Sequence, residues 1–183
     1  MMSKVACVAA ALAIGAEAAP RLTGCPKDYS PMENFDLERY TGTWYEIVRD
    51  KYTPFELLQS CIGAEYTANE DGTVTVQNSG WRPVQGWSDV KGSAVVADTG
   101  DASLVVSFGK KTPSPSDKAN YTVLDTDYET YSIVYSCGSF MNLASFDFLW
   151  ILAREKELDE TTMLSLVSKI EDKLPAYGFF HNH

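Results

Sequence analysis

Histidine is nearly absent from this chain. Its two histidines, His181 and His183, lie among the last three of 183 residues. A histidine-based catalytic triad and a three-histidine metal site both need imidazoles that converge inside a fold. The sequence therefore argues against hydrolases and metalloenzymes of those kinds, and no metal site is expected.

Basic residues are also scarce. The chain has 15 lysines and arginines against 25 aspartates and glutamates, which gives a net charge of -10. Nucleic-acid binding requires clustered Lys and Arg side chains that displace counterions from phosphates. No nucleic-acid partner is expected, and the acidic residues are interpreted as a solvated surface.

The chain lacks a hydrophobic run long enough for a membrane span. The apolar run from Val5 to Ile14 is too short to cross a bilayer. It follows Lys4 and precedes small residues, an arrangement typical of a secretory signal peptide that is cleaved after Ala18. We expect residues 1–18 to be this signal peptide and residues 19–183 to form one domain. The protein is therefore predicted to be secreted, with the lumen of a plastid or endomembrane compartment as the alternative.

Few cysteines remain once residues 1–18 are removed. They are Cys25, Cys61 and Cys137. In an oxidising compartment one pair of these cysteines is expected to form a disulfide. Because three is an odd number, one thiol is left over.

Eight short runs rich in β-branched and aromatic residues make up most of the chain, separated by turn signals such as Asp71-Gly72. No helix of useful length separates them, which excludes a parallel sheet with crossover helices and favours an antiparallel meander. Eight such strands close naturally into an up-and-down barrel with room for side chains or one small ligand. The predicted strands are residues 44–50, 61–68, 73–79, 90–97, 103–108, 120–127, 130–137 and 148–154.

One amphipathic helix is predicted after the strands, over about residues 160–174. Asp159 is a suitable N-cap, and Pro175 follows the end of the pattern. We expect this helix to pack against the outside of a barrel that covers about residues 42–154. Its apolar residues at helical spacing are Met163, Leu166, Val167, Ile170 and Leu174.

Three sequence blocks, in order, carry a resemblance to a known family. They are "NFDLERYTGTWYEI" with its Gly-x-Trp motif, "TDYETYSIVYSC", and "FLWILAR". Together they resemble the lipocalin family, and within it the apolipoprotein D-like proteins. The motif residues are Gly42, Trp44, Thr126, Asp127, Tyr128 and Arg154.

The resemblance implies an all-β fold, an eight-stranded antiparallel barrel with one C-terminal helix outside it. It also implies that the protein binds and transports a small hydrophobic ligand of the fatty acid, sterol, retinoid, carotenoid or bilin class. A role in lipid handling or in protection against lipid oxidation would follow. No cofactor is expected beyond such a ligand or pigment, and the protein is expected to be a monomer or a weak dimer.

Trp44 and Arg154 are expected to close one end of the barrel. The planar guanidinium of Arg154 can lie over the indole while it donates hydrogen bonds to nearby carbonyl groups. Gly42 supplies the tight bend that lets the entering segment cross beneath the barrel. The Thr126–Tyr128 block is predicted to organise a turn near the same end, where Asp127 can bind backbone donors.

Strand alternation predicts which side chains face a ligand cavity, with Trp44 taken as inward and lipocalin parity as a guide. The inward side chains are mostly apolar, several of them small, with a few polar groups among them. This is the usual composition of a small-molecule site. By resemblance, Asn78 and Arg82 match polar residues at the cavity mouth, and Trp150 matches a cavity tryptophan. The predicted ligand-binding residues are Val48, Ala64, Tyr66, Val76, Asn78, Arg82, Ala94, Leu104, Val106, Phe108, Val134 and Trp150.

The resemblance also implies a disulfide between Cys25 and Cys137, which would tie the N-terminal arm to the barrel. Cys61 matches a family cysteine whose partner lies in a C-terminal tail, but the tail of this chain contains no cysteine. Cys61 is therefore predicted to be a free thiol or to pair with another chain.

Two other functions stay open. A lipocalin-type enzyme could use the Cys61 thiol for lipid isomerisation or peroxide reduction. No histidine or nearby base is evident to activate that thiol, so we expect no enzymatic activity. A subunit of a pigment complex would share the same fold.

Two surface features complete the expectations. Residues 139–146 contain Phe140, Met141, Leu143 and Phe146 without strand alternation, and such a loop could contact a membrane or lipoprotein surface. The Asn120-Tyr-Thr122 sequence is an N-glycosylation sequon, although it begins a predicted strand.

Overall fold

The computed structural model describes residues 25–50, 53–56, 58–100, 102–140, 144–175 and 177. The predicted signal peptide, residues 1–18, and both histidines lie outside this part of the chain. The strands are β1 (Gly42–Arg49), β2 (Ser60–Ala68), β3 (Val74–Arg82), β4 (Gly86–Val96), β5 (Ser103–Phe108), β6 (Tyr121–Thr126), β7 (Tyr131–Phe140) and β8 (Ala144–Ala153).

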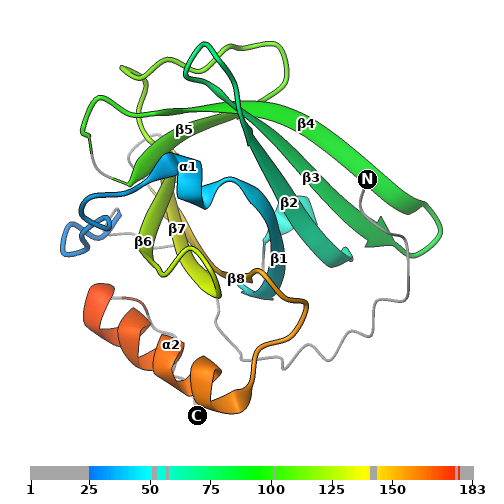
Figure 1. Cartoon of the computed structure of the whole chain (residues 1–183), viewed down its shortest axis with the longest axis vertical. Coiled ribbons are helices and arrows are strands. Elements are labelled where there is room, and N and C mark those ends of the chain that lie inside the picture. Colours follow the sequence, from blue (N-terminus) through cyan, green and yellow to red (C-terminus); the bar gives the residue numbers. More distant parts are fainter. Residues whose placement is uncertain are drawn as a thin grey trace.

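These strands form a closed barrel in which each strand pairs with the next one in the chain. Strand β1 pairs antiparallel with both β2 and β8, so the sheet has no open edge at the point of closure. Figure 1 shows the strands curving around a common interior, with helix α2 lying along the outside. The predicted eight-stranded barrel with an external C-terminal helix is confirmed.

Helix α2 (Glu160–Lys173) follows the barrel. The carboxylate of Asp159 caps its first turn by accepting from the Thr162 backbone N–H at 2.9 Å. The buried face of the helix packs against outward side chains of the barrel wall, forming a core outside the barrel interior. That outer core contains Val48, Leu124, Ile133, Tyr135, Leu149, Ile151, Met163, Leu166, Ile170, Leu174 and Tyr177.

Two short helical pieces flank the barrel and were not predicted. Helix α1 (Leu37–Tyr40) precedes β1, and Asp36 caps it by accepting from the Arg39 backbone N–H at 3.1 Å. The 3₁₀ turn η1 (Pro54–Glu56) lies between β1 and β2 at the opposite end. Pieces of three or four residues are too short to show a hydrophobic period, so sequence alternation cannot reveal them.

The prediction that Val48 faces the cavity is wrong. The β1–β8 register shifts between Glu46 and Val48, which marks a β-bulge at Ile47. A bulge adds one residue to the strand and reverses the facing of the residues beyond it. Val48 consequently packs in the outer core beneath helix α2 rather than inside the barrel.

The structure forms the predicted disulfide between Cys25 and Cys137. The sulfur atoms are 2.07 Å apart, and the bond joins residues 112 positions apart in the chain. The N-terminal arm is thereby fixed to β7.

The prediction of a free thiol at Cys61 is wrong. Cys61 is disulfide-bonded, and the described part of the chain contains no free cysteine. The prediction rested on the odd number of cysteines after residue 18 and on a tail without cysteine, and neither observation reports which thiols pair in the fold. Among the described residues, no helix has the length and hydrophobicity needed to cross a membrane.

Candidate functional site

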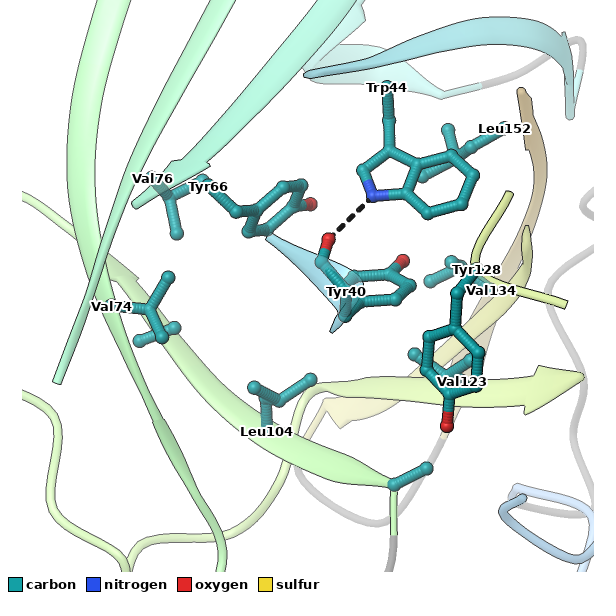
Figure 2. Packing of buried hydrophobic residues seen from close by; sticks show 12 residues of the cluster. Tyr40, Trp44, Tyr66, Val74, Val76, Leu104, Val123, Tyr128, Val134 and Leu152 are labelled. Atoms are coloured by element: carbon teal, nitrogen blue, oxygen red, sulfur yellow. Dashed lines mark hydrogen bonds between the residues drawn. The ribbon is translucent and has the colours of Figure 1, made fainter. Parts of the chain in front are cut away.

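One end of the barrel is closed by Trp44, which is fully buried. The Trp44 indole N–H donates to the Tyr40 carbonyl at 2.8 Å, which joins β1 to helix α1 (Figure 2). As predicted, the guanidinium of Arg154 lies over the indole ring, with its central carbon 3.7 Å from the ring centroid. Arg154 thus covers the outer face of the plug.

Arg154 also ties three chain segments together below the barrel. Its Nε donates to the Tyr128 carbonyl at 2.9 Å, and its Nη1 donates to the Thr43 carbonyl at 3.0 Å. Its Nη2 donates to the Arg39 carbonyl at 3.0 Å. A planar guanidinium can satisfy three such acceptors at once, which a lysine cannot do in the same geometry.

Gly42 allows this close approach. Its φ is +94°, and a Cβ at this position would lie 3.3 Å from Nη1 of Arg154. Any other residue would therefore meet both an unfavourable backbone conformation and a crowded neighbour. The predicted bend under the barrel is present at this residue.

The Thr126–Tyr128 block forms a turn beside the same plug. Oδ1 of Asp127 accepts from the backbone N–H groups of Glu129, Thr130 and Tyr131, at 2.7 to 3.1 Å. Partial burial alone would raise the pKa of Asp127, but these backbone donors hold it below its ordinary value. Asp127 therefore acts as a turn-forming carboxylate, as predicted from the sequence.

The cavity floor consists of aromatic rings and a chain of hydroxyl groups. Tyr66 donates to the Tyr121 hydroxyl at 3.0 Å, and the Tyr121 and Tyr40 hydroxyls lie 2.8 Å apart. The Tyr40 hydroxyl in turn lies 3.0 Å from Oγ of Ser132. Burial raises the pKa of Tyr40 to about 12, so these groups stay protonated. The floor presents neutral hydroxyls to anything above it.

Above this floor, the barrel encloses a cavity of about 680 Å³. This volume lies within the range of small-molecule sites. Most of the predicted ligand-binding residues line it: Ala64, Tyr66, Val76, Asn78, Arg82, Val106, Phe108, Val134 and Trp150.

Ala94 and Leu104 face inward but do not line this cavity. Both are buried in the apolar cluster that contains Trp44. Alternation gives the face of a strand residue but not its height along the barrel axis. The two residues therefore belong to the packed floor, and their prediction as ligand contacts finds no support in the geometry.

Sequence reasoning missed part of the mouth, contributed by η1 and the residues after it. Phe55, Glu56 and Gln59 all line the cavity. The Phe55 ring packs at 5.5 Å from the Phe148 ring, and the Trp150 indole N–H donates to Glu56 at 3.2 Å. The apolar run "PFELL" was the one signal for this segment, but a run without alternation does not indicate where its side chains point.

Arg82 holds this segment over the mouth. Its Nη2 donates to the Phe55 carbonyl at 3.1 Å. With the Gln59 amide oriented to satisfy both groups, the amide oxygen accepts from Nε and Nη2 of Arg82 at 3.0 and 2.8 Å. Asn78, which lines the cavity wall, has a buried Oδ1 without a hydrogen-bond partner in the described structure.

Two carboxyl groups are buried in the cavity wall. Glu46 lies on β1 and Glu56 on η1, and both line the cavity. Burial, followed by the nearby charge of Glu56, raises the pKa of Glu46 to about 8, although Arg49 opposes this shift. Burial also raises the pKa of Glu56.

Both surface expectations stay predictions. Asn120 is exposed and joins the strands, with its amide nitrogen donating to the Val106 carbonyl at 2.8 Å, so its glycosylation stays a prediction. Of the predicted loop 139–146, residues 141–143 lie outside the described residues, and Phe146 is exposed.

Within the described residues, no group of three or more His, Cys, Asp or Glu side chains is placed to hold a metal ion.

Comparison with known proteins places this geometry in a family. Residues 35–179 match the family model described as a lipocalin-like domain. Apolipoprotein D of Cavia porcellus is 40% identical over 135 residues, covering 73% of this chain and 68% of the relative. Apolipoprotein D of Macaca fascicularis is 42% identical over 132 residues, covering 72% of this chain and 67% of the relative.

A solved structure gives the same fold. Insecticyanin from the tobacco hornworm Manduca sexta superposes with a TM-score of 0.70 at 24% sequence identity. The superposition covers 86% of this chain and 82% of the other.

Proposed function

The chain belongs to the lipocalin family, and on that premise we propose that it carries a small hydrophobic ligand in the barrel cavity. The observation that supports this most strongly is a preformed cavity of about 680 Å³ above a closed aromatic floor. The family resemblance implies a ligand of the fatty acid, sterol, retinoid, carotenoid or bilin class. The predicted lining residues, without Val48, Ala94 and Leu104, are proposed as ligand contacts.

Binding in such a cavity depends mainly on apolar burial. A ligand that buries about 300 Å² of apolar surface gains at most about 8 kcal/mol. Loss of rigid-body freedom reduces this gain, so micromolar affinity is expected. The buried and unpartnered Oδ1 of Asn78 offers one polar contact inside the cavity. Moderate affinity suits a carrier that must release its cargo.

Native mass spectrometry of protein purified from its source tests the proposal, because it reports the mass of a retained ligand. A Ser136→Trp variant should lose the ligand, since Ser136 lines the cavity and an indole would occupy part of its volume. Lys91→Trp, at an exposed site on β4, is the control. Ligand retained by wild type and Lys91→Trp but lost by Ser136→Trp is expected. Equal retention by all three would contradict the proposal.

We propose that carriage involves no covalent chemistry. Cys61, the thiol considered for an enzyme, is disulfide-bonded and is absent from the cavity lining. A disulfide-bonded sulfur is not an available thiolate nucleophile. Unchanged mass of a model lipid or lipid peroxide after incubation with the protein is expected, and turnover would contradict it. Visible absorption of native protein would instead support the pigment-complex function.

The Cys25–Cys137 disulfide and the predicted signal peptide support secretion.

Exposed apolar residues near the cavity mouth support contact with a lipid surface. Phe55 and Trp81 are 55% and 39% exposed, and Val84 at the tip of the β3–β4 hairpin is fully exposed. Phe55 lines the cavity, and Trp81 and Val84 flank the lining residue Arg82 in sequence. Exposed apolar groups there favour collection of cargo from a membrane or lipoprotein. Liposome flotation should fall for Trp81→Ser/Val84→Ser and persist for Leu164→Ser on α2. Equal flotation would contradict lipid contact through the mouth.

A further inference from the structure

The carboxyl pair in the cavity wall is formed by two residues from different segments. Glu46 on β1 is nearly fully buried, and its Oε1 accepts from Nη1 of Arg49 at 2.6 Å. The carboxyl groups of Glu46 and Glu56 also interact with each other, and this interaction contributes to the raised pKa of Glu46. Glu56 also accepts from the Trp150 indole N–H at 3.2 Å. Two acids with raised pKa values therefore line the same ligand cavity.

The charge around this pair is balanced only while Glu46 is protonated. Arg49 supplies one positive charge, which with ionised Glu56 and protonated Glu46 gives a neutral cluster. The Nη2 of Arg49 is already used, donating to the Gln59 carbonyl at 2.8 Å. Arg49 is not among the residues that line the cavity, so its charge faces the carboxyl of Glu46 rather than a ligand.

Positive charge is otherwise limited to the mouth. Arg82 is the one cationic side chain among the described lining residues, and it is held by the Phe55 carbonyl and by Gln59. Asp89 adds a further acid at the same entrance. The described cavity lining therefore contains three carboxyl groups against one guanidinium.

We propose that Glu46 and Glu56 recognise a protonated amine on the hydrophobic ligand and select such ligands over carboxylates of equal chain length. This inference rests on the proposed function, because it names the ligand class for the same cavity. An alkylammonium group would take the place of the proton on Glu46, which leaves to solvent, and would donate hydrogen bonds to both carboxylates. Glu46, Glu56, Arg49 and the ammonium would again sum to zero charge.

A carboxylate ligand lacks this compensation. Seated at the same depth, it would place an unpaired negative charge beside Glu56 in a site shielded from water, which is strongly unfavourable. A neutral alcohol can donate one hydrogen bond but carries no charge, so its affinity should fall between the other two. Charge-assisted hydrogen bonds are roughly twice as strong as neutral ones, which sets the order amine, alcohol, carboxylate.

The test compares decylamine, decanol and decanoate as competitors for a fluorescent apolar probe at neutral pH. Wild-type protein should bind decylamine at least about tenfold more tightly than decanoate, as expected for one charge-assisted hydrogen bond. In Glu46→Gln/Glu56→Gln this preference should fall to within about threefold, while decanol affinity is kept. Retained decanol binding also demonstrates that the variant is folded.

The matched control is Glu70→Gln/Glu160→Gln, which makes the same two substitutions at exposed sites outside the cavity. This control should keep the full preference for the amine. Equal affinity for the three compounds in wild type, or tighter binding of decanoate, would overturn the inference while leaving the carrier function in place. Failure of all three compounds to displace the probe would instead count against the carrier function itself.

Discussion

The two ends of the barrel differ in how their polar groups are used. At the closed end, each donor of Arg154 described above is paired with a backbone carbonyl, and Asp127 is saturated by backbone N–H groups. At the open end, Asn78 has a buried oxygen without a partner in the described structure, and Glu46 and Glu56 are buried acids with raised pKa values. A polar group bonded to the backbone stabilises the fold, whereas the Asn78 oxygen and the two cavity-lining acids can interact with a ligand.

The residues that stabilise the fold and the residues proposed to bind ligand are therefore separated along the barrel axis. The Gly-x-Trp motif is at the closed end, and the proposed ligand contacts are nearer the open end. Changes at the closed end should therefore lower the free energy of unfolding, and changes at the open end should alter ligand affinity or its pH dependence.

The largest effect is expected for Trp44→Ala at the closed end. Removing a fully buried indole should lower the free energy of unfolding by about 3–5 kcal/mol. Denaturant unfolding measures this loss, and ligand titration of the folded variant should give an affinity close to that of wild type. Loss of affinity without loss of stability would show that the plug contacts the ligand.

Removal of the Cys25–Cys137 disulfide should have the next largest effect. Replacing both cysteines by Ala should lower the free energy of unfolding by about 2–4 kcal/mol, chiefly because the unfolded chain gains freedom. Denaturant unfolding with and without reductant measures this loss. Reductant should lower the free energy of unfolding of wild type by breaking this bond, and the variant should not show that part of the decrease. Stability equal to wild type under oxidising conditions would contradict the prediction.

Gly42→Ala should cost about 1–2 kcal/mol of stability, because the residue has positive φ and lies close to Arg154. Gly72→Ala is the matched control, since Gly72 also has positive φ but no atom lies within 4 Å of its would-be Cβ. The difference between the two thermal unfolding midpoints isolates the contact with Arg154. Equal losses would show that this contact contributes nothing.

The last effect, at the open end, concerns pH. The pKa of Glu46 is raised from 4.5 to about 8, so the native state holds a proton that the unfolded state releases. The contribution of Glu46 to stability is therefore full below about pH 4.5 and is lost as the pH rises to about 8. Glu46→Gln should flatten the fall of unfolding free energy across this window, whereas Glu70→Gln should not. A slope equal to wild type would mean that Glu46 is ionised in the folded protein.

Much of the fold followed from the sequence because regular alternation and turn chemistry repeat along the chain. The eight strands, the closed barrel and helix α2 were predicted to within a few residues. Val48 was misplaced because one bulged residue reverses the facing of those after it, and the sequence "YEIVR" contains no sign of the bulge.

The candidate site was less predictable, since it depends on height along the barrel and on a non-repeating segment. Ala94 and Leu104 have the predicted facing but lie in the floor. Glu56 and Gln59 reach the cavity from an irregular segment whose path is fixed by Arg82 and Trp150, contacts that no local pattern encodes. Cys61 was assigned as a free thiol from an odd cysteine count and from a tail without cysteine, neither of which reports pairing in the fold.

The assignment of the ligand to the barrel interior can be tested most directly by methyl NMR during titration with decylamine. Shifts are expected for the methyl groups of Val76, Val106 and Val134, which line the cavity, and none for Leu166 and Ile170 on the buried face of helix α2. Shifts confined to the helix side, with the cavity valines unchanged, would contradict the assignment of the barrel interior as the ligand site.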